Sequence, residues 1–185
     1  LINVEDTLGE TKVVLDSMTF KDISITETYR LGELLGPLGR IAFPHKDTMN
    51  IPDMPGLIQG KNIPIDASEH FESMTFHKGY LRIKIFNWFP TDLANVSITL
   101  KDANNNNTIG SFSFSLIPSR SSVIDSVFLG GMTIYKDLIA ILNNADVLAS
   151  SGPVIINHWD AIVFRIEITD IGLTEATAIF PAQQV

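Results

Sequence analysis

Four histidines and 21 acidic residues are the side chains of this chain that metal binding or acid–base catalysis would use. His70 and Glu72 stand two positions apart, so in a strand they would share a face and supply at most two ligands. Zinc sites usually take three or four protein ligands, and His45, His77 and His158 have no partner at such a spacing. The chain also has no cysteine, which excludes disulfides, thiol catalysis and cysteine-based zinc sites. We therefore expect no metal and no cofactor.

Motifs for covalent or phosphate chemistry are absent from the sequence. There is no G-x-S-x-G elbow to mark a serine nucleophile, no G-x-x-x-x-G-K-[ST] phosphate loop and no G-x-G-x-x-G motif. The acidic residues are numerous enough to supply a catalytic pair, but no pair stands out. We expect a protein that is not an enzyme.

An oxygen-rich segment covers residues 102–107, with Asp102 followed by Asn104, Asn105, Asn106 and Asn107. Carboxylate and amide oxygens bind calcium, but the segment lacks the D-x-D-x-D-G frame of a calcium loop. Asn and Asp also tolerate the left-handed backbone conformations of tight turns. The segment therefore predicts a solvated hairpin tip.

Aromatic side chains stand where strands are expected to end. Trp88 and Phe89 precede Pro90, and Trp159 follows His158 at an expected turn. Aromatics in such places either cover the core or form a ligand platform. A tryptophan offers a flat apolar face that can stack on a sugar or line a lipid pocket.

Three further phenylalanines, Phe112, Phe114 and Phe164, occupy alternating strand positions. In a sandwich that opens at one end, they could form the walls of an apolar cavity, with residues 31–62 or Trp88 at its mouth. The candidate ligand-binding residues are Trp88, Phe89, Phe112, Phe114, Trp159 and Phe164.

Alternation of apolar and polar residues predicts strands through most of the chain. The clearest cover residues 62–66, 80–86, 96–100, 109–116, 123–129, 154–156 and 161–169. The pattern of residues 11–28 predicts two strands or one bent strand. Residues 133–149 fit both a helix and a strand, and we favour the strand.

Glycine and proline recur throughout residues 31–62 and interrupt regular secondary structure. This predicts a long loop with a short helical turn near its start. Short strands joined by turns are typical of a sandwich or barrel. The chain is thus predicted to be all-β, an antiparallel β-sandwich or flattened barrel with a long Gly/Pro-rich loop. A length of 185 residues fits a single domain over residues 1–185, with 1–61 as a less regular N-terminal lobe.

The chain combines 45% hydrophobic residues with a net charge of −8. Nucleic-acid binding needs clustered Lys and Arg, and the 13 here are scattered along the sequence, so no nucleic-acid partner is expected. No apolar run reaches the roughly 18 residues of a membrane span. The chain begins at Leu1 rather than Met, so we expect that residues preceded it, and a secretory leader fits that place.

A family resemblance is carried by residues 86–92, 96–100, 109–110, 116–118 and 121–123. They resemble the pattern N-x-x-P, strand, I-G, strand, I-P-x-x-S-S, strand of late-embryogenesis-type (water-stress) β-sandwich domains. The pattern and residues 178–183 also resemble uncharacterised extracytoplasmic β-proteins of Bacteroidetes-like bacteria, some described as lipid-binding. The resemblance covers roughly residues 62–129 and the C-terminus. It implies a β-sandwich outside the cytoplasm and no catalytic residue.

These observations favour a non-enzymatic, extracytoplasmic binding module for an apolar, lipid-like ligand. The surplus of apolar residues and the resemblance both point to that ligand. The alternative is a structural or adhesive domain of a larger cell-surface protein, in which the surplus forms an interface with a partner domain or a second copy. Carbohydrate binding through Trp88 and Trp159 is a third hypothesis.

Overall fold

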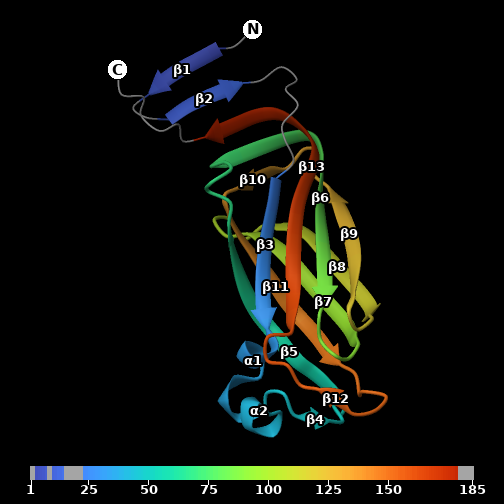
Figure 1. The fold of residues 1–185 in the computed structure, drawn as a ribbon. Helices are drawn as coiled ribbons and strands as arrows, with labels where there is room; N and C mark the ends of the chain where they lie inside the picture. The colour runs from blue at the N-terminus through green and yellow to red at the C-terminus, as the bar shows by residue number, and fades with distance from the viewer. Residues whose placement is uncertain (1–2, 8–9, 15–22, 179–185) are drawn as a thin grey trace.

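The computed structural model describes residues 3–7, 10–14 and 23–178, with only the backbone described for 3–7, 10–14 and Ala178. Two antiparallel sheets enclose one hydrophobic core (Figure 1). The larger sheet contains β1 (Asn3–Thr7), β2 (Glu10–Val14), β3 (Ile23–Arg30), β6 (Ser73–Asn87), β9 (Ser121–Phe128), β10 (Thr133–Tyr135) and β13 (Ala161–Ala178). The smaller sheet has the order β5 (Met54–Asp66), β11 (Asp137–Val147), β7 (Leu93–Asp102) and β8 (Thr108–Ile117). The predicted all-β antiparallel sandwich is confirmed.

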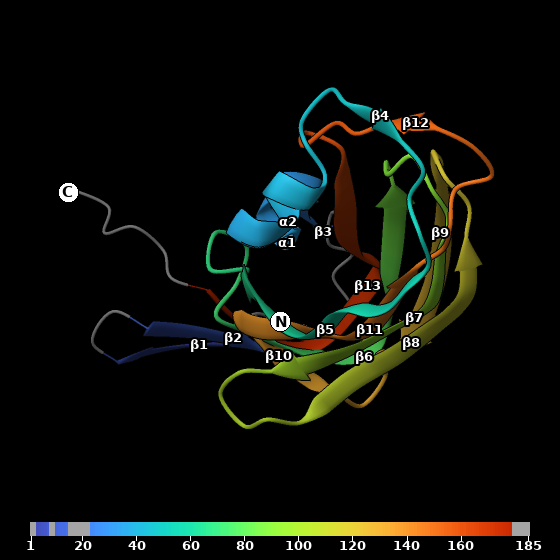
Figure 2. The same cartoon turned by 90° about the horizontal axis from the view of Figure 1, so that it is seen from below.

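The lower end of the sandwich is closed by short elements. These are α1 (Leu31–Leu34), α2 (Gly36–Ala42), and a ribbon formed by β4 (Thr48–Met49) and β12 (Val154–Ile155). Figure 2, which looks along the strands, shows them gathered around this end. No helix in the described part of the chain is long and apolar enough to cross a membrane.

The core follows the alternation of the sequence. Ile83 and Ile85 of β6 are fully buried, as are Val96, Ile98 and Leu100 of β7, at 0–2% exposure. Because successive strand residues point to opposite faces, the residues between them point away from the core. This confirms the predicted division of the two faces.

Residues 133–149 form β10 and β11, so the preference for strand over helix is confirmed. The segment pairs with β6, β5 and β7. Sheet pairing therefore decided between two periodicities that the sequence left open.

The irregular segment is shorter than the predicted loop over residues 31–62. Helices begin it, and β5 already starts at Met54. β5 is an edge strand that pairs only with β11 among the described strands, and an edge tolerates proline and glycine better than a central strand. Gly56 and Gly60 have φ of +62° and +59°, values that favour glycine.

Part of the prediction for residues 11–28 lies outside the described residues, as does most of the segment 178–183. β2 and β3 occupy the described parts of 11–28. The prediction of one domain over 1–185 also includes undescribed residues and stays a prediction.

Candidate functional site

An aromatic pair stands on the outer face of the larger sheet. The rings of Phe86 and Trp88 are nearly parallel, with an interplanar angle of 7° and centroids 6.1 Å apart. They continue the outward-facing series of Arg82 and Lys84 on β6, and Trp88 is 44% exposed. We call Phe86 and Trp88 the aromatic platform. The helices lie beyond the end of this sheet, not over the platform's strand (Figure 1).

Buried Asn87 fixes the chain between the two rings. Its Nδ2 donates to the carbonyl oxygens of Thr91 at 2.9 Å and Ile117 at 3.0 Å, and its Oδ1 accepts the Phe89 N–H at 3.0 Å. Its side chain thereby joins the loop after β6 to the turn after β8. A side chain held at three points leaves little freedom to the backbone of its neighbour, Trp88.

The neighbouring turn adds further anchors. Ser119 Oγ donates to the Phe89 carbonyl at 2.7 Å, and the Ser119 N–H donates to Asp92 at 2.7 Å. Arg120 forms a two-bonded pair with buried Asp160, at 3.1 and 2.7 Å, the strongest geometry for a guanidinium and a carboxylate. The backbone that carries the platform is therefore anchored by hydrogen bonds from two neighbouring loops.

Two cations contact the platform. The Lys84 Nζ lies 4.8 Å from the Phe86 ring centroid, and the Arg165 guanidinium carbon lies 5.4 Å from it. Both are within the range of cation–π attraction. Among the described residues no carboxylate lies within ion-pair distance of either cation.

A second aromatic group lies at the same end of the sheet. Trp159 is 67% exposed, and the Arg30 guanidinium lies over its ring at 5.6 Å. These two residues border an open cavity of about 160 Å³ that is also lined by Gly32, Glu33, Arg40 and His158. Glu33 pairs with Arg30 at 3.4 Å, and hydrogen bonding to the Arg30 backbone holds the pKa of Glu33 below its usual value.

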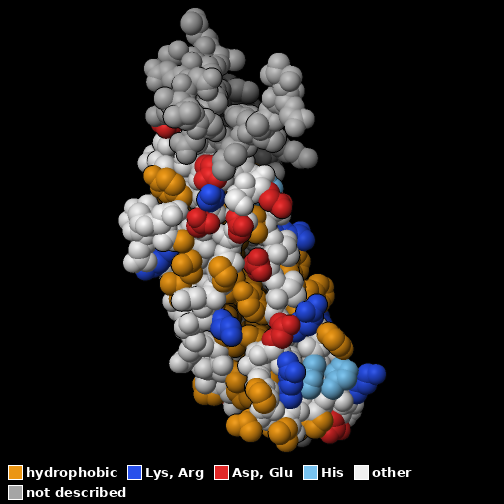
Figure 3. Space-filling model, turned by 90° about the vertical axis from the view of Figure 1, so that its left-hand side faces the viewer, with side chains coloured by type: hydrophobic (Ala, Val, Ile, Leu, Met, Phe, Trp, Pro, Cys, Tyr) orange, Lys and Arg blue, Asp and Glu red, His pale blue; other side chains and the backbone are white. Residues whose placement is uncertain are grey.

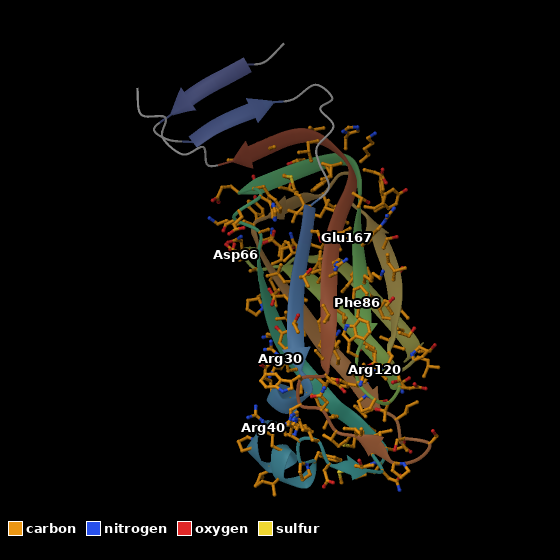
Figure 4. The ribbon with its side chains drawn as sticks, in the orientation of Figure 1. Arg30, Arg40, Asp66, Phe86, Arg120 and Glu167 are labelled. Carbon is orange, nitrogen blue, oxygen red and sulfur yellow. The ribbon has the colours of Figure 1, made fainter. Side chains whose placement is uncertain are left out.

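The two aromatic groups flank one strand. Arg30 of β3 is paired with Ala161 of β13, and the Trp88 N–H donates to the Ala161 carbonyl at 2.9 Å. Two strand spacings, about 10 Å, therefore separate the backbones of Arg30 and Trp88. Figure 4 shows Arg30, Phe86 and Arg120 across the lower half of this sheet.

A separate apolar pocket lies under the helices at the lower end. Its cavity volume is about 20 Å³, roughly the space of one water molecule. Phe89 is the only candidate residue among its walls, which are Leu31, Leu35, Phe43, Ile51, Met54, Leu57, Phe89, Pro90, Thr91, Val147 and Ile156.

The three strand phenylalanines do not meet around a cavity in the described structure. Phe112 and Phe164 are 2% and 3% exposed within the core, and Phe114 is a partly buried neighbour of that core. A ligand that touched all three would have to displace core side chains. The structure thus separates the six candidates into the exposed Trp88 and Trp159, the pocket residue Phe89, and the core group.

Comparison with known proteins identifies no family for this chain. No family model and no curated protein matches it. Among solved structures, it is similar to a carbohydrate-binding module of the Cellvibrio mixtus lichenase 5A in complex with cellotriose. The identity is 11% and the TM-score 0.29, over 75% of this chain and 95% of the module. A likeness this weak carries no argument about the ligand.

The candidate metal residues have other partners in the structure. Glu72 binds the Lys136 ammonium at 2.7 Å. Asp102 accepts the backbone N–H groups of Asn104 at 2.8 Å and Asn105 at 3.3 Å, as a turn-forming side chain does. Among the described residues, no group of three His, Asp or Glu side chains could hold a metal ion.

Sequence reasoning missed Phe86, Lys84, Arg165 and Asn87 as site residues. The alternation in residues 82–88 was a usable signal for the first two, because it places every second side chain on one face. Arg165 is brought to that face by the pairing of β13 with β6, which no sequence motif indicates.

Proposed function

We propose that this chain is a non-enzymatic binding module that takes a carbohydrate on the outer face of its larger sheet. The observation that carries the proposal is the aromatic platform: a half-exposed tryptophan, parallel to a second ring and held by a buried asparagine. Sugar rings have apolar C–H faces that stack on such surfaces.

Hydrogen-bonding side chains surround the platform. Ser122 of β9 is paired with Phe86, and Thr28 of β3 lies beyond Val163, which pairs with Phe86 from the other side. Ser122 and Thr28 are exposed. An open face that combines flat rings with hydroxyls suits an extended, hydroxyl-rich chain. An extracytoplasmic location, as expected from the sequence resemblance, is part of the proposal.

A lipid-like ligand receives less support. An alkyl chain needs an enclosed apolar volume of hundreds of Å³, and the apolar pocket at the lower end offers about 20 Å³. Lipid binding in the described structure would require that pocket to open.

Binding to an array of neutral and charged polysaccharides tests the proposal. Trp88→Ala should weaken binding about 30-fold, the loss of roughly 2 kcal/mol typical of a central tryptophan. Phe128→Ala is the matched control, because Phe128 is also a half-exposed aromatic, on β9 beside Tyr80. Absence of binding to every glycan, or equal binding by the Trp88 variant, would contradict the proposal.

The apolar lower end favours a second candidate, an adhesive or structural domain. Leu38 and Ile41 of α2 are 82% and 76% exposed, and Ile155 is 62% exposed. Figure 3 shows hydrophobic side chains along this end beside histidine and basic side chains. If this end is an interface between copies, Leu38→Asp with Ile41→Asp should abolish a concentration-dependent dimer in analytical ultracentrifugation. A protein that stays monomeric at all concentrations excludes that interface.

A further inference from the structure

We infer that the carbohydrate is acidic, and that Lys84 and Arg165 bind its carboxylate or sulfate groups beside the aromatic platform. The inference rests on the proposed function and adds the chemical class of the ligand. Its observation is independent of the tryptophan: the sheet register places two cations side by side, and no carboxylate of the described residues lies within ion-pair distance of either.

Lys84 and Arg165 are direct cross-strand partners. The register of β6 and β13 places them opposite each other, and both point to the outer face. Like charges in this position repel and destabilise a sheet. Many residue types would be tolerated on an open face, so two adjacent cations cost stability that an anionic ligand would offset.

Their neighbours do not neutralise them. Two residues away along β6, Arg82 stands opposite Glu167 of β13 in the strand register. The carboxylate of Asp170 lies 4.0 Å from the Arg82 guanidinium. On the β9 side the partner of Lys84 is Ile124, and on the β3 side the partner of Arg165 is Thr26. Of these two carboxylates, that of Asp170 forms an ion pair with Arg82, and Glu167 (Figure 4) stands opposite Arg82 rather than opposite Lys84.

The ring contacts place the cations where a bound sugar would need them. Both charges lie over Phe86, and Phe86 is parallel to Trp88. A sugar stacked on the platform would present its ring substituents to these side chains. A guanidinium matches carboxylate and sulfate oxygens with two parallel hydrogen bonds, and an ammonium adds a point charge.

The negative charge of the whole chain confines polyanion binding to the positive group formed by Lys84 and Arg165. With a net charge of −8, most of the surface repels a polyanion, so attraction is confined to the local positive group. Binding should then weaken as salt rises, because exposed charges are screened over about 8 Å at physiological ionic strength.

The experiment compares polysaccharides that differ in their charged groups: polygalacturonate with its neutral methyl ester, and dextran sulfate with dextran. The native protein should bind the charged members about tenfold more tightly than the neutral ones at low salt, as two exposed charge contacts would give. The two charged probes distinguish a carboxylate ligand from a sulfate ligand.

Lys84→Gln with Arg165→Gln should remove that preference and its salt dependence, so that charged and neutral members bind with equal affinity. Lys61→Gln with Lys101→Gln is the control, because it removes the same charge from the smaller sheet. Lys84→Arg with Arg165→Lys should keep the preference, and a cooperative thermal unfolding transition shows that each variant is folded.

The outcomes separate the two proposals. Equal affinity for charged and neutral partners would overturn the acidic ligand and leave carbohydrate binding intact. A preference that survives the Gln double variant would also overturn it. If no polysaccharide binds at all, the result contradicts both carbohydrate binding and the acidic ligand.

Discussion

Asn87 ties together the backbone segments on either side of Trp88 and the turn after β8. Its amide satisfies buried carbonyls on two separate loops and the N–H of Phe89. Asparagine suits the role because its side chain carries both a donor and an acceptor. The N-x-x-P pattern that begins at residue 87 thus has a physical meaning here, since it ties the platform to the turn at Pro118.

Asn87→Ala should destabilise the protein by about 3 kcal/mol, because it leaves buried polar groups without partners. It should also weaken glycan binding, since Trp88 loses its support. Chemical denaturation measures the first effect and titration calorimetry the second. Asn104→Ala, on the exposed hairpin tip, is the control and should cost less than about 0.5 kcal/mol. A similar cost for both variants would show that the Asn87 bonds contribute little.

At the scale of elements, β7 shows how burial sets strand register. Ile98 is 1% exposed between the two sheets, while its neighbour Thr99 points outward and accepts a hydrogen bond from Asn143 at 2.9 Å. A slip of one residue would exchange these two environments. Burial of Ile98 therefore specifies the register of β7.

Ile98→Ala should lower the free energy of unfolding by about 2–5 kcal/mol, the usual cost of truncating a buried aliphatic residue. Thr99→Ala should cost less than about 1 kcal/mol. Urea denaturation of both variants checks the difference. If Ile98→Ala had no effect, the inward orientation of this position would be wrong.

Asp146 links three strands of the smaller sheet. Its carboxylate accepts hydrogen bonds from Asn95 at 2.7 Å, from the Gly56 N–H at 2.6 Å and from Asn144 at 3.0 Å. These bonds, that from Asn95 first, hold the pKa of Asp146 below its ordinary value of 3.8. They therefore stabilise the fold above pH 3.8, and that contribution is lost as the pH falls through the lower pKa of the folded state.

Asp146→Asn should reduce stability at neutral pH, and the difference from the native protein should shrink below pH 3.8, the ordinary value of this carboxyl. Thermal unfolding of both proteins over a pH series measures this. A difference that is the same at neutral and strongly acidic pH would mean that the carboxylate charge is not what these bonds require.

At the scale of the whole molecule, charge and apolar surface are unevenly distributed. The outer face of the larger sheet carries Lys84, Arg165 and the platform, although the chain as a whole is acidic. The lower end exposes Leu38 and Ile41 instead. The molecule therefore presents two chemically distinct surfaces, one with cations beside aromatic rings and one with exposed aliphatic side chains.

Metal binding by the protein would depend on its His, Asp and Glu side chains. We expect no stoichiometric divalent metal after dialysis, because the sequence offers no three-ligand spacing. Elemental analysis by mass spectrometry measures the metal content. One equivalent of retained metal would contradict the expectation, and His70→Ala would then show whether His70 is a ligand.

The sequence by itself determined the strands, because alternation in segments such as residues 80–86 and 161–169 directly reflects one buried face. It also indicated Trp88 and Trp159 as ligand-binding candidates from their places at strand ends, but left open whether they cover the core, and the structure places both at the surface. It could not decide between helix and strand at residues 133–149, since pairing with β5 and β7 made that choice.

Only the tertiary structure decided which aromatics are accessible and which charges meet. Phe112 and Phe164, like Phe86, are phenylalanines in strands of alternating pattern. Packing between the sheets nevertheless buries them. Lys84 and Arg165 are 81 positions apart in the numbering, and the register of β6 and β13 makes them neighbours. Sequence patterns report the period of one strand, whereas contacts between strands depend on register and sheet order, which arise only when the core forms.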